Sequence, residues 1–598
     1  MKMIKKLFFI CIFLISFSLT SQEIATNLFH NPLLNNFKFH NNNNNKSSLS
    51  LPFVDDFSYN SHTVNFDLWE HSTVFVNRTY PINPPTIGVI TFDGLDEYGL
   101  ARNLSSTSSE PSDTLLSKNI DLSMISSAYL LFYYQAQGLG DVPEFQDKLL
   151  LEFKNDSLTW ETVWVAEDTI LEDFTKVIQV INQPRFLFNE FQFRFVNYAS
   201  ISGNFDHWHV DYVKMDELQS ITDTSELNDA SFVYNSPSFL KRYQEMPWSH
   251  FLNNEADELK DSIDILLRNN DAPTNIDYQF NVFDNGNQVY HYPLIGISRN
   301  VTVLDYNQIG NFSFNSPPIL LQSNIFSSFQ PDSLSFLVQN IIGTNSSDNK
   351  LNDTLLHSQN FYSHFSYDDG TAESAYGINV SGAQLAYEFK LNRPDTLRAV
   401  QMYFPQMLDS VNDIPFKLTI WDNLSPSGNI LYQQEVFPFH TQNGNFHTYY
   451  IDEPFQLVGT FYVGWEQTTD DLLNIGLDKN NISNSYMYYN IGSGWNQSSY
   501  LGSWMIRPLV SMKPIISSLD DYSSNIKIYP NPVDTYCFIE TIENSSIINI
   551  YSIQGILQKQ IFSKTLLTKL DLKDLSSGVY IIEILRNYSK EYRKIILK

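Results

Sequence analysis

The chain has 598 residues, of which 42% are hydrophobic and 15% aromatic, and its formal net charge is −29 at pH 7. This length predicts several packed domains, since one domain usually holds about 100–200 residues. The excess of acidic side chains repels phosphate backbones and anionic lipid, and it excludes a nucleic-acid-binding protein.

The first 21 residues predict a secretory signal peptide. Lys2, Lys5 and Lys6 precede an apolar run at residues 7–17, and small residues follow it. No later stretch reaches the about 18 uninterrupted apolar residues of a membrane-spanning helix. Once the signal peptide is removed, Cys537 is the single cysteine of the sequence, so we expect no disulfide within the mature chain.

Residues 22–50 include five consecutive asparagines and few apolar side chains, and we predict a disordered lead-in there. Residues 51–218 then show short apolar–polar alternations separated by turn residues such as Ser202-Gly203-Asn204. No helix-period pattern competes with them. We therefore predict one large jelly-roll-like β-sandwich.

Both ends of this predicted sandwich carry acidic residues. Val54-Asp55-Asp56-Phe57 and the segment 208–213 resemble the paired first and last strands of MAM-like and carbohydrate-binding jelly rolls. The resemblance implies that these strands lie side by side, which brings Asp55, Asp56 and Asp211 together. Carboxylates gathered in this way suit calcium, which takes about six to eight oxygen ligands. We predict a structural calcium ion here; the alternative is a solvated acidic edge without metal.

His207, His209 and Asp211 are spaced by two residues in the same segment. On a strand they share one face, while Trp208 and Val210 point to the other. Two imidazoles and a carboxylate on one face are a candidate zinc site. The alternative is an outer sandwich face that is exposed to solvent and holds no metal.

Residues 220–229 predict an acidic linker, and residues 230–359 predict an immunoglobulin-like or fibronectin-like spacer domain. Alternation over residues 278–283, followed by Asp284-Asn285-Gly286-Asn287, predicts a β-hairpin. A helical pattern at residues 255–260 is the one competing signal.

Residues 360–511 predict a second jelly-roll-like sandwich with many aromatic side chains. Near its start, Tyr367-Asp368-Asp369-Gly370 predicts either another calcium site or a plain turn. A late aromatic group either stacks on sugar rings or fills the core; its members are Trp465, Tyr488, Tyr489, Trp495, Tyr500 and Trp504.

Residues 512–524, which include Pro514 and several serines, predict an accessible linker. Residues 525–598 then predict a small immunoglobulin-like sandwich of six or seven short strands, a size typical of that fold class. The two prolines of Tyr529-Pro530-Asn531-Pro532 end its first strand because neither supplies a backbone donor. Gly555 and Gly578 supply turns.

The same stretch resembles the type A C-terminal sorting domain of the type IX secretion system of Bacteroidetes. The resemblance rests on four features in order, namely Tyr529-Pro530-Asn531-Pro532, Gly555 in a central hairpin, Gly578 and Tyr580 in LSSGVY, and Lys594 and Lys598 at the end. It implies recognition of these residues by the type IX machinery and export through the outer membrane. It also implies removal of the domain by a sortase-like peptidase, with the body released or attached to the cell surface.

The sequence carries no Gly-x-Ser-x-Gly elbow, no His-Glu-x-x-His and no phosphate-cradling glycine-rich loop. We therefore expect a secreted or cell-surface, non-catalytic binding or adhesion protein whose ligand is a glycan or another surface protein. The alternative is an accessory or degenerate hydrolase that acts on extracellular polysaccharide or protein.

Overall fold

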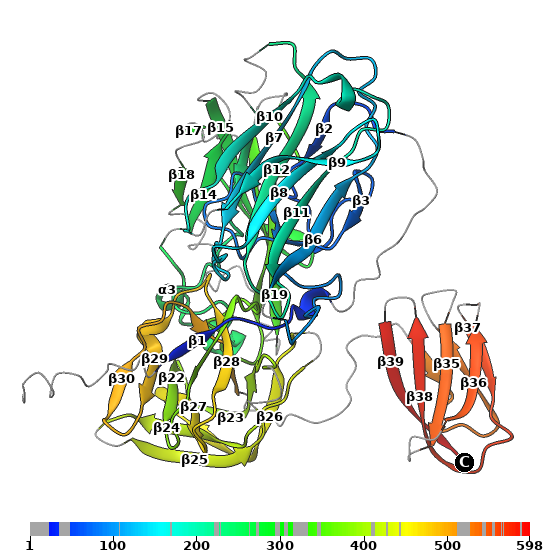
Figure 1. Cartoon of the computed structure of the whole chain (residues 1–598). Helices are drawn as coiled ribbons and strands as arrows, with labels where there is room; N and C mark the ends of the chain where they lie inside the picture. Colours follow the sequence, from blue (N-terminus) through cyan, green and yellow to red (C-terminus); the bar gives the residue numbers. More distant parts are fainter. Residues whose placement is uncertain are drawn as a thin grey trace, which may run out of the picture. The chain divides into compact units, whose positions relative to one another are not determined.

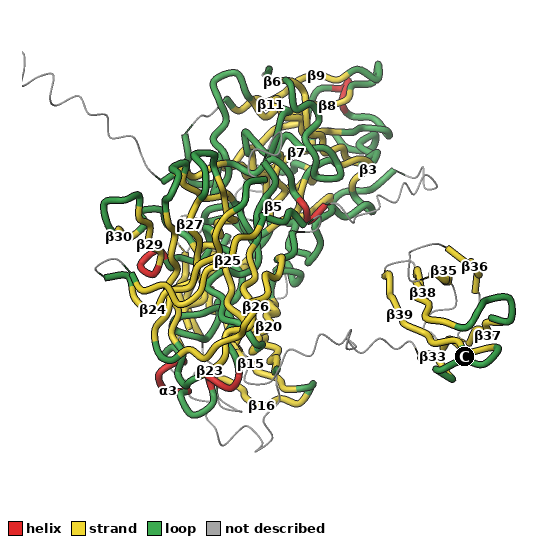
Figure 2. Tube along the Cα trace, turned by 90° about the horizontal axis from the view of Figure 1, so that it is seen from below, coloured by secondary structure: helices red, strands yellow, loops and turns green. Residues whose placement is uncertain are grey.

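The computed structural model describes residues 23–34, 48–106, 108–167, 170–220, 227, 229–261, 263–270, 274–293, 300–303, 309–314, 333–343, 348–407, 413–425, 428–441, 444–510, 527–540, 546–552, 557–563, 565, 567–586 and 589–598. Strands dominate this part, in which α2 (Trp248–Phe251) and α3 (Glu255–Glu258) are single turns, so the all-β prediction is confirmed (Figures 1 and 2). The chain separates into two compact units, residues 1–513 and 514–598.

Two antiparallel sheets form the first sandwich. One has the strand order β10-β7-β12-β5-β4 with β2 beside β12, and the other has the order β3-β6-β11-β8-β9. The first sheet consists of β2 (Phe53–Asp55), β4 (Phe75–Asn77), β5 (Val89–Phe92), β7 (Ala128–Ala136), β10 (Thr175–Ile181) and β12 (Trp208–Glu217). The second consists of β3 (Trp69–Ser72), β6 (Ser109–Ser117), β8 (Lys148–Lys154), β9 (Trp160–Ala166) and β11 (Phe193–Ser200).

The core of this sandwich follows from the alternation of its strands. Phe193 points inward from β11 and meets the rings of Phe53 and Trp69 edge-to-face, at centroid distances of 5.4 and 5.6 Å. Such aromatic pairs add to the free energy that burial of their area provides. The predicted pairing of first and last strands is confirmed, because β2 lies beside β12 with Asp55 opposite Val213.

β12 is buried on both of its faces. Trp208 and Val210 belong to the main core between the sheets, whereas Tyr212 packs with Tyr133 and Leu227 in a second apolar cluster. The register of β12 shifts between Asp211 and Lys214, and Val213 belongs to the main core beyond the shift. Tyr212 therefore lies in a different buried layer from Val210, although the two are two residues apart.

Residues 230–361 form two further sheets, with the orders β13-β14-β18 and β16-β15-β19-β20, the latter with β17 beside β15. Their strands are β13 (Ala230–Phe232), β14 (Ile263–Asn269), β15 (Thr274–Asp284), β16 (Asn287–Tyr292), β17 (Asn300–Val303), β18 (Ile309–Phe314), β19 (Leu334–Gly343) and β20 (Thr354–Phe361). The predicted hairpin is confirmed as β15–β16, with Asn285 and Gly286 at its tip. Both have positive φ, which these two residue types adopt readily.

The second sandwich contains sheets with the orders β25-β24-β27-β22-β29-β30 and β26-β23-β32, and a smaller sheet β1-β21-β28-β31 lies with them. The large sheet consists of β22 (Gln384–Lys390), β24 (Phe416–Asn423), β25 (Asn429–Val436), β27 (Thr460–Gln467), β29 (Met487–Asn490) and β30 (Trp495–Gln497). The others consist of β23 (Asp395–Met402), β26 (His447–Leu457), β32 (Ile506–Val510), β1 (Ile24–Thr26), β21 (Ser374–Ile378), β28 (Leu473–Asp478) and β31 (Ser503–Trp504).

Residues 230–361 are not a separate spacer, which corrects that part of the sequence prediction. Their buried side chains, such as Phe280 and Phe336, belong to the same hydrophobic cluster as Phe389 and Leu397 of the second sandwich. The short helix α2 adds a buried polar contact, since His250 Nε2 lies 3.0 Å from Asp395 Oδ2. The shared core makes the two regions one packed body.

Part of the predicted disordered lead-in has a defined structure, which is a second correction. Ile24–Thr26 forms β1, which pairs antiparallel with β21, and Pro32–Leu34 forms a 3-10 turn. Figure 1 shows β1, in dark blue, among the green and yellow strands of the second sandwich. The asparagine run lies outside the described residues. A three-residue strand carries almost no sequence signal of its own, because its stability comes from its partner strand.

The C-terminal unit has two sheets, with the orders β33-β34-β37 and β36-β35-β38-β39. They consist of β33 (Lys527–Tyr529), β34 (Tyr536–Glu540), β35 (Ser546–Ser552), β36 (Leu557–Ser563), β37 (Leu567–Asp571), β38 (Gly578–Arg586) and β39 (Ser589–Leu597). Their inward side chains, including Ile550, Ile582 and Ile595, form one core. The seven strands of the described residues agree with the predicted six or seven.

Candidate functional site

The predicted calcium ligands are all buried, and each accepts hydrogen bonds from the protein. Asp55 accepts from the Trp69 indole at 2.7 Å and from the backbone N–H of Phe57 at 3.0 Å. Asp211 accepts from Thr86, through the backbone at 2.9 Å and the hydroxyl at 3.0 Å.

Asp56 accepts from the side-chain amides of Asn349 at 2.6 Å and Asn352 at 3.0 Å, and from the Ser58 hydroxyl at 2.9 Å. These hydrogen bonds stabilise the buried carboxylate of Asp56, as a bound cation would.

Burial also disfavours the charged forms of two of these acids. It raises the pKa of Asp55 to about 7 and raises that of Asp211 well above its ordinary value. Across the described ranges, no three His, Cys, Asp or Glu side chains are arranged to hold a metal ion. Asp55, Asp56 and Asp211 therefore do not fit calcium, although they lie near one another as predicted.

The two histidines of β12 are also buried, so the predicted solvent-exposed face is wrong. His209 lies 2.8 Å from the Thr91 hydroxyl and 3.2 Å from the carbonyl oxygen of Gln137. His207 accepts from the backbone N–H of Asp141 at 2.9 Å, and its ring stacks on Tyr80. Burial lowers the pKa of His209 to about 4 and that of His207 well below its ordinary value. Both imidazoles are neutral parts of the core.

In the segment 367–370 the geometry fits the plain turn rather than the metal site. Asp368 pairs with the Arg507 guanidinium, whose Nε lies 3.2 Å from its carboxylate, and it accepts from the backbone of Gly370 at 3.0 Å. Asp369 accepts from the backbone of Thr371 at 2.9 Å. Local turn bonds and one ion pair therefore occupy these carboxylates.

Next to this turn lies a group of buried acids that sequence reasoning missed. Asp478 accepts from the backbone N–H of Asp369 at 2.9 Å, and Glu373 accepts from that of Lys479 at 2.9 Å. Burial, together with repulsion from Asp369, raises the pKa of Glu373 to about 8 and that of Asp478 well above its ordinary value. These acids are more than 100 residues apart in the chain, so no spacing in the sequence announces them.

The predicted sugar-stacking group is mostly core. Trp465 and Trp504 are buried in the large hydrophobic cluster. Trp495 is half-buried, with its ring edge-to-face on Trp421 at a centroid distance of 5.5 Å. Tyr488, Tyr489 and Tyr500 are half-buried as well. Trp465 and Trp504 are therefore core residues, and the other four are partly exposed.

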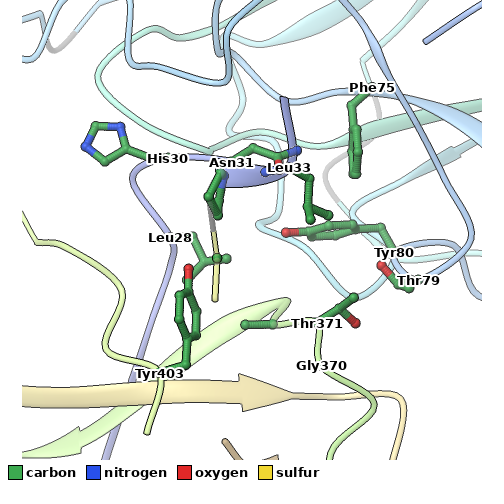
Figure 3. A pocket seen from close by; sticks show the side chains of 13 residues that line it. Leu28, His30, Asn31, Leu33, Phe75, Thr79, Tyr80, Gly370, Thr371 and Tyr403 are labelled. Carbon is green, nitrogen blue, oxygen red and sulfur yellow. The ribbon is translucent and has the colours of Figure 1, made fainter. Parts of the chain in front are cut away.

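A narrow cleft lies where the N-terminal segment crosses between the two sandwiches (Figure 3). Its volume is about 460 Å³, open mouth included, and its walls carry Leu28, His30, Phe75, Tyr80 and Tyr403. The tyrosines are only 6% and 7% exposed, so their ring faces are already covered by protein. The cleft therefore has no free aromatic platform for a sugar ring.

Exposed aromatic side chains occur instead after β25, where Phe437 is 63% and Phe439 is 53% exposed. The Phe439 ring stacks on the His447 imidazole at a centroid distance of 4.5 Å. Sequence analysis missed this pair because nothing in the local pattern distinguishes an exposed phenylalanine from a core one.

The residues predicted for sorting lie in the C-terminal unit, except that Gly555 is outside the described residues. Asn531 fastens the edge strand β39: its amide donates to the carbonyl oxygen of Lys594 at 2.9 Å, and its oxygen accepts from the N–H of Ile596 at 3.0 Å. The backbone of Lys598 donates to the carbonyl oxygen of Val533 at 2.8 Å. The motif of Tyr529, Pro530, Asn531 and Pro532 is thereby tied to the last strand.

At the same end of the sheet, Gly578 begins β38 opposite Leu597 of β39, and the buried Tyr580 donates its hydroxyl to the carbonyl oxygen of Ser576 at 2.7 Å. The side chains of Lys594 and Lys598 are exposed. The described sorting residues therefore contribute either to the fold of this unit or to its charged surface.

A family model described as "Secretion system C-terminal sorting domain" matches residues 527–598. No curated protein matches the chain. In the described residues, no helix is long and apolar enough to cross a membrane.

Solved structures give low similarity. The surface component PorZ of the Porphyromonas gingivalis type IX secretion system is 17% identical at a TM-score of 0.12, over 22% of this chain and 17% of its own. The tandem CBM22 modules of Paenibacillus barcinonensis Xyn10C are 6% identical at a TM-score of 0.18, and the match covers 72% of this chain and 98% of theirs. Tandem CBM51 modules of a Streptococcus pneumoniae glycoside hydrolase are 10% identical at a TM-score of 0.17, and the match covers 71% of this chain and 98% of theirs. We draw nothing on ligands from these values.

The order of the motifs and the family match agree. Residues 527–598 are a C-terminal sorting domain of the type IX secretion system, and the protein is one that this domain directs to the cell surface or into the medium.

Proposed function

We propose that the body of this exported protein is a non-catalytic binding protein for a neutral glycan, and that the aromatic surface of Phe437 and Phe439 contacts the sugar rings. The exposure of these two side chains carries the proposal. Contiguous exposed apolar patches mark interaction sites, whereas single exposed apolar side chains are common on protein surfaces. Phe437 and Phe439 are exposed together, two residues apart in the chain.

The backbone beneath these side chains is fixed. The buried Tyr449 hydroxyl donates to the carbonyl oxygen of Phe437 at 2.9 Å and accepts from the N–H of Phe439 at 3.1 Å. One residue further on, His440 lies 2.8 Å from Asp413 and 3.0 Å from the carbonyl oxygen of Phe404. A ring that is already ordered loses little conformational entropy when a ligand stacks on it.

The surroundings suit a sugar. An aromatic face attracts the weakly positive C–H groups on one face of a pyranose ring, and the exposed Asp413 carboxylate beside it accepts hydrogen bonds from hydroxyl groups. The net charge of −29 disfavours an acidic polymer. A neutral polysaccharide offers pyranose C–H faces and hydroxyl groups, and it carries no negative charge.

The test compares the chain from Gln22 to Lys598 with its double variant Phe437→Ser/Phe439→Ser in sedimentation with insoluble neutral polysaccharides. Phe145→Ser is the matched control, because Phe145 is 94% exposed and belongs to the first sandwich. Loss of two stacking contacts at about 0.5–1.5 kcal/mol each predicts binding weakened by about 5- to 150-fold. The control variant should bind like the unaltered chain.

Equal binding by the double variant and the unaltered chain, or no binding to any neutral polysaccharide, would overturn the proposal. The supernatants of the same assay are examined for newly formed reducing ends. Their release by the unaltered chain would favour the alternative of an accessory hydrolase.

A further inference from the structure

We propose, resting on the function proposed above, that the glycan is an extended chain of several sugar rings that lies across the large sheet of the second sandwich. The chain runs from Phe437 at one edge of the sheet to Trp495 at the other. The register of six strands, the hydrogen bonds along one row of side chains and the position of the Trp495 ring lead to this inference.

One row of directly opposite residues crosses this sheet, whose six strands are labelled in Figure 1. From β30 to β25 the row consists of Trp495, Asn490, Gln384, Glu466, Lys417 and Glu435. Their chain neighbours Leu385, Trp465 and Leu418 belong to the hydrophobic core. Because strand side chains alternate between faces, the row lies on the outer face of the sheet. Five strand spacings give it a length of about 24 Å.

Hydrogen bonds hold the polar side chains of this row in place. The Asn490 amide donates to Gln384 Oε1, and the Gln384 amide donates to Glu466 Oε2, both at 3.3 Å. The Lys417 ammonium donates to Glu466 Oε1 at 2.7 Å. These groups have more donor and acceptor sites than the bonds use, and they suit hydroxyl groups, which both donate and accept. Lys417 is paired with Glu466, and the exposed Glu435 adds a negative charge, so the row disfavours an anionic sugar.

Trp495 ends the row on the edge strand β30. Asn490 Oδ1 accepts from the N–H groups of Gly492 and Gly494 at 2.9 and 3.0 Å, which fixes the turn before Trp495. The partly exposed Trp495 ring meets Trp421 of β24 edge-to-face at a centroid distance of 5.5 Å. In a flat sheet four strand spacings would separate β30 from β24 by about 19 Å. The sheet therefore curves toward this face, and the Trp495 ring leans inward over it.

The other end of the row meets the aromatic surface of Phe437 and Phe439. Glu435 lies opposite Lys417, and exposure alternates along β25 and beyond it, with Gln433, Glu435 and Phe437 exposed. Phe437 therefore lies on the same face, two residues beyond the row. A single sugar ring cannot span about 24 Å, whereas a chain of several rings contacts both aromatic ends. The second contact is then intramolecular, which tightens binding without any further group.

The test uses the chain from Gln22 to Lys598 in sedimentation with cellulose, curdlan, mannan and chitin. A disaccharide and a hexasaccharide prepared from each polysaccharide that binds then compete in solution. Trp495→Ser removes the ring at the far end, and Gln384→Ala removes one polar member of the row. Tyr450→Ser is the matched control, because Tyr450 is 58% exposed and lies on β26 of the other sheet.

We expect the hexasaccharide to compete at a concentration about tenfold or more below that of the disaccharide. Trp495→Ser should weaken sedimentation by about 2- to 13-fold, Gln384→Ala should weaken it as well, and Tyr450→Ser should leave it unchanged.

Equal competition by the two oligosaccharides, or unchanged binding by either Trp495→Ser or Gln384→Ala, overturns this inference. The proposed function survives that result if Phe437→Ser/Phe439→Ser still loses binding. No binding of the unaltered chain to any of the four polysaccharides overturns both.

Discussion

At the scale of single residues, the body shows how buried acids are stabilised by hydrogen-bond donors of the protein. Asp55 relies on the Trp69 indole, and Asp211 relies on Thr86, 125 residues away in the sequence. The resemblance of the two segments to paired first and last strands correctly implies that β2 lies beside β12. It cannot predict these donors, because they come from strands and loops whose placement depends on the whole sandwich.

The calcium prediction is tested directly by melting. We expect the melting temperature of the chain to be the same with added calcium and with a chelator, since the oxygens of Asp55, Asp56 and Asp211 already accept hydrogen bonds from protein donors. Differential scanning calorimetry makes the measurement. A rise of several degrees with calcium, absent in Asp56→Asn, would restore the predicted site.

Buried Glu373 predicts a dependence of stability on pH. Its pKa is raised to about 8 in the folded chain, against about 4.3 in an unfolded one. Between these values the folded state holds a proton that the unfolded state has lost, so the free energy of unfolding falls as pH rises from about 4.3 to about 8.

Glu373→Gln should therefore flatten the decline in melting temperature across this pH range, because the neutral amide resembles the protonated acid. Glu453→Gln, at an exposed position on β26, is the control and should leave the decline unchanged. An identical pH profile for Glu373→Gln and the unaltered chain would show that this acid is ionised in the fold.

At the scale of elements, alternation of apolar and polar residues locates the long strands well and the short ones poorly. β8 and β22 lie inside the two predicted sandwiches. β1 was missed, because three residues hold too few alternations and its stability depends on a partner elsewhere. That partner, β21, lies about 350 residues further along the sequence.

The Asn531 side chain fastens the edge strand β39 to the rest of the C-terminal unit. Its two hydrogen bonds to β39 replace those of a missing neighbour strand. Asn531→Asp keeps the oxygen that accepts from Ile596 but loses the donor to Lys594. We expect the C-terminal unit to lose about 1–3 kcal/mol of stability, since the Lys594 carbonyl oxygen loses its donor and faces a charge.

Urea denaturation of the full chain, followed by hydrogen exchange at β39, measures this effect. The control is Asp534→Asn, whose side chain is 77% exposed in its pair with Lys598. Unchanged exchange at β39 in Asn531→Asp would mean that the motif is not what secures the last strand.

At the scale of the whole molecule, the chain divides its tasks between two units. Residues 1–513 form a large body that contains both sandwiches, and residues 514–598 form a small unit with a core of its own. This division was predictable from composition and motif order, because the sorting features lie together in one stretch. The joining of residues 230–361 to the second sandwich was not predictable, because a shared core leaves no trace in local sequence patterns.

The central claim is that the C-terminal unit exports the body. The most direct measurement is fractionation of a Bacteroidetes culture that expresses either the full chain or a chain ending at Ser524, with an antibody to residues 51–218. We predict that the full chain reaches the surface or medium, shortened by its C-terminal unit, while the truncated chain stays in the periplasm. Equal export of both chains would contradict the account.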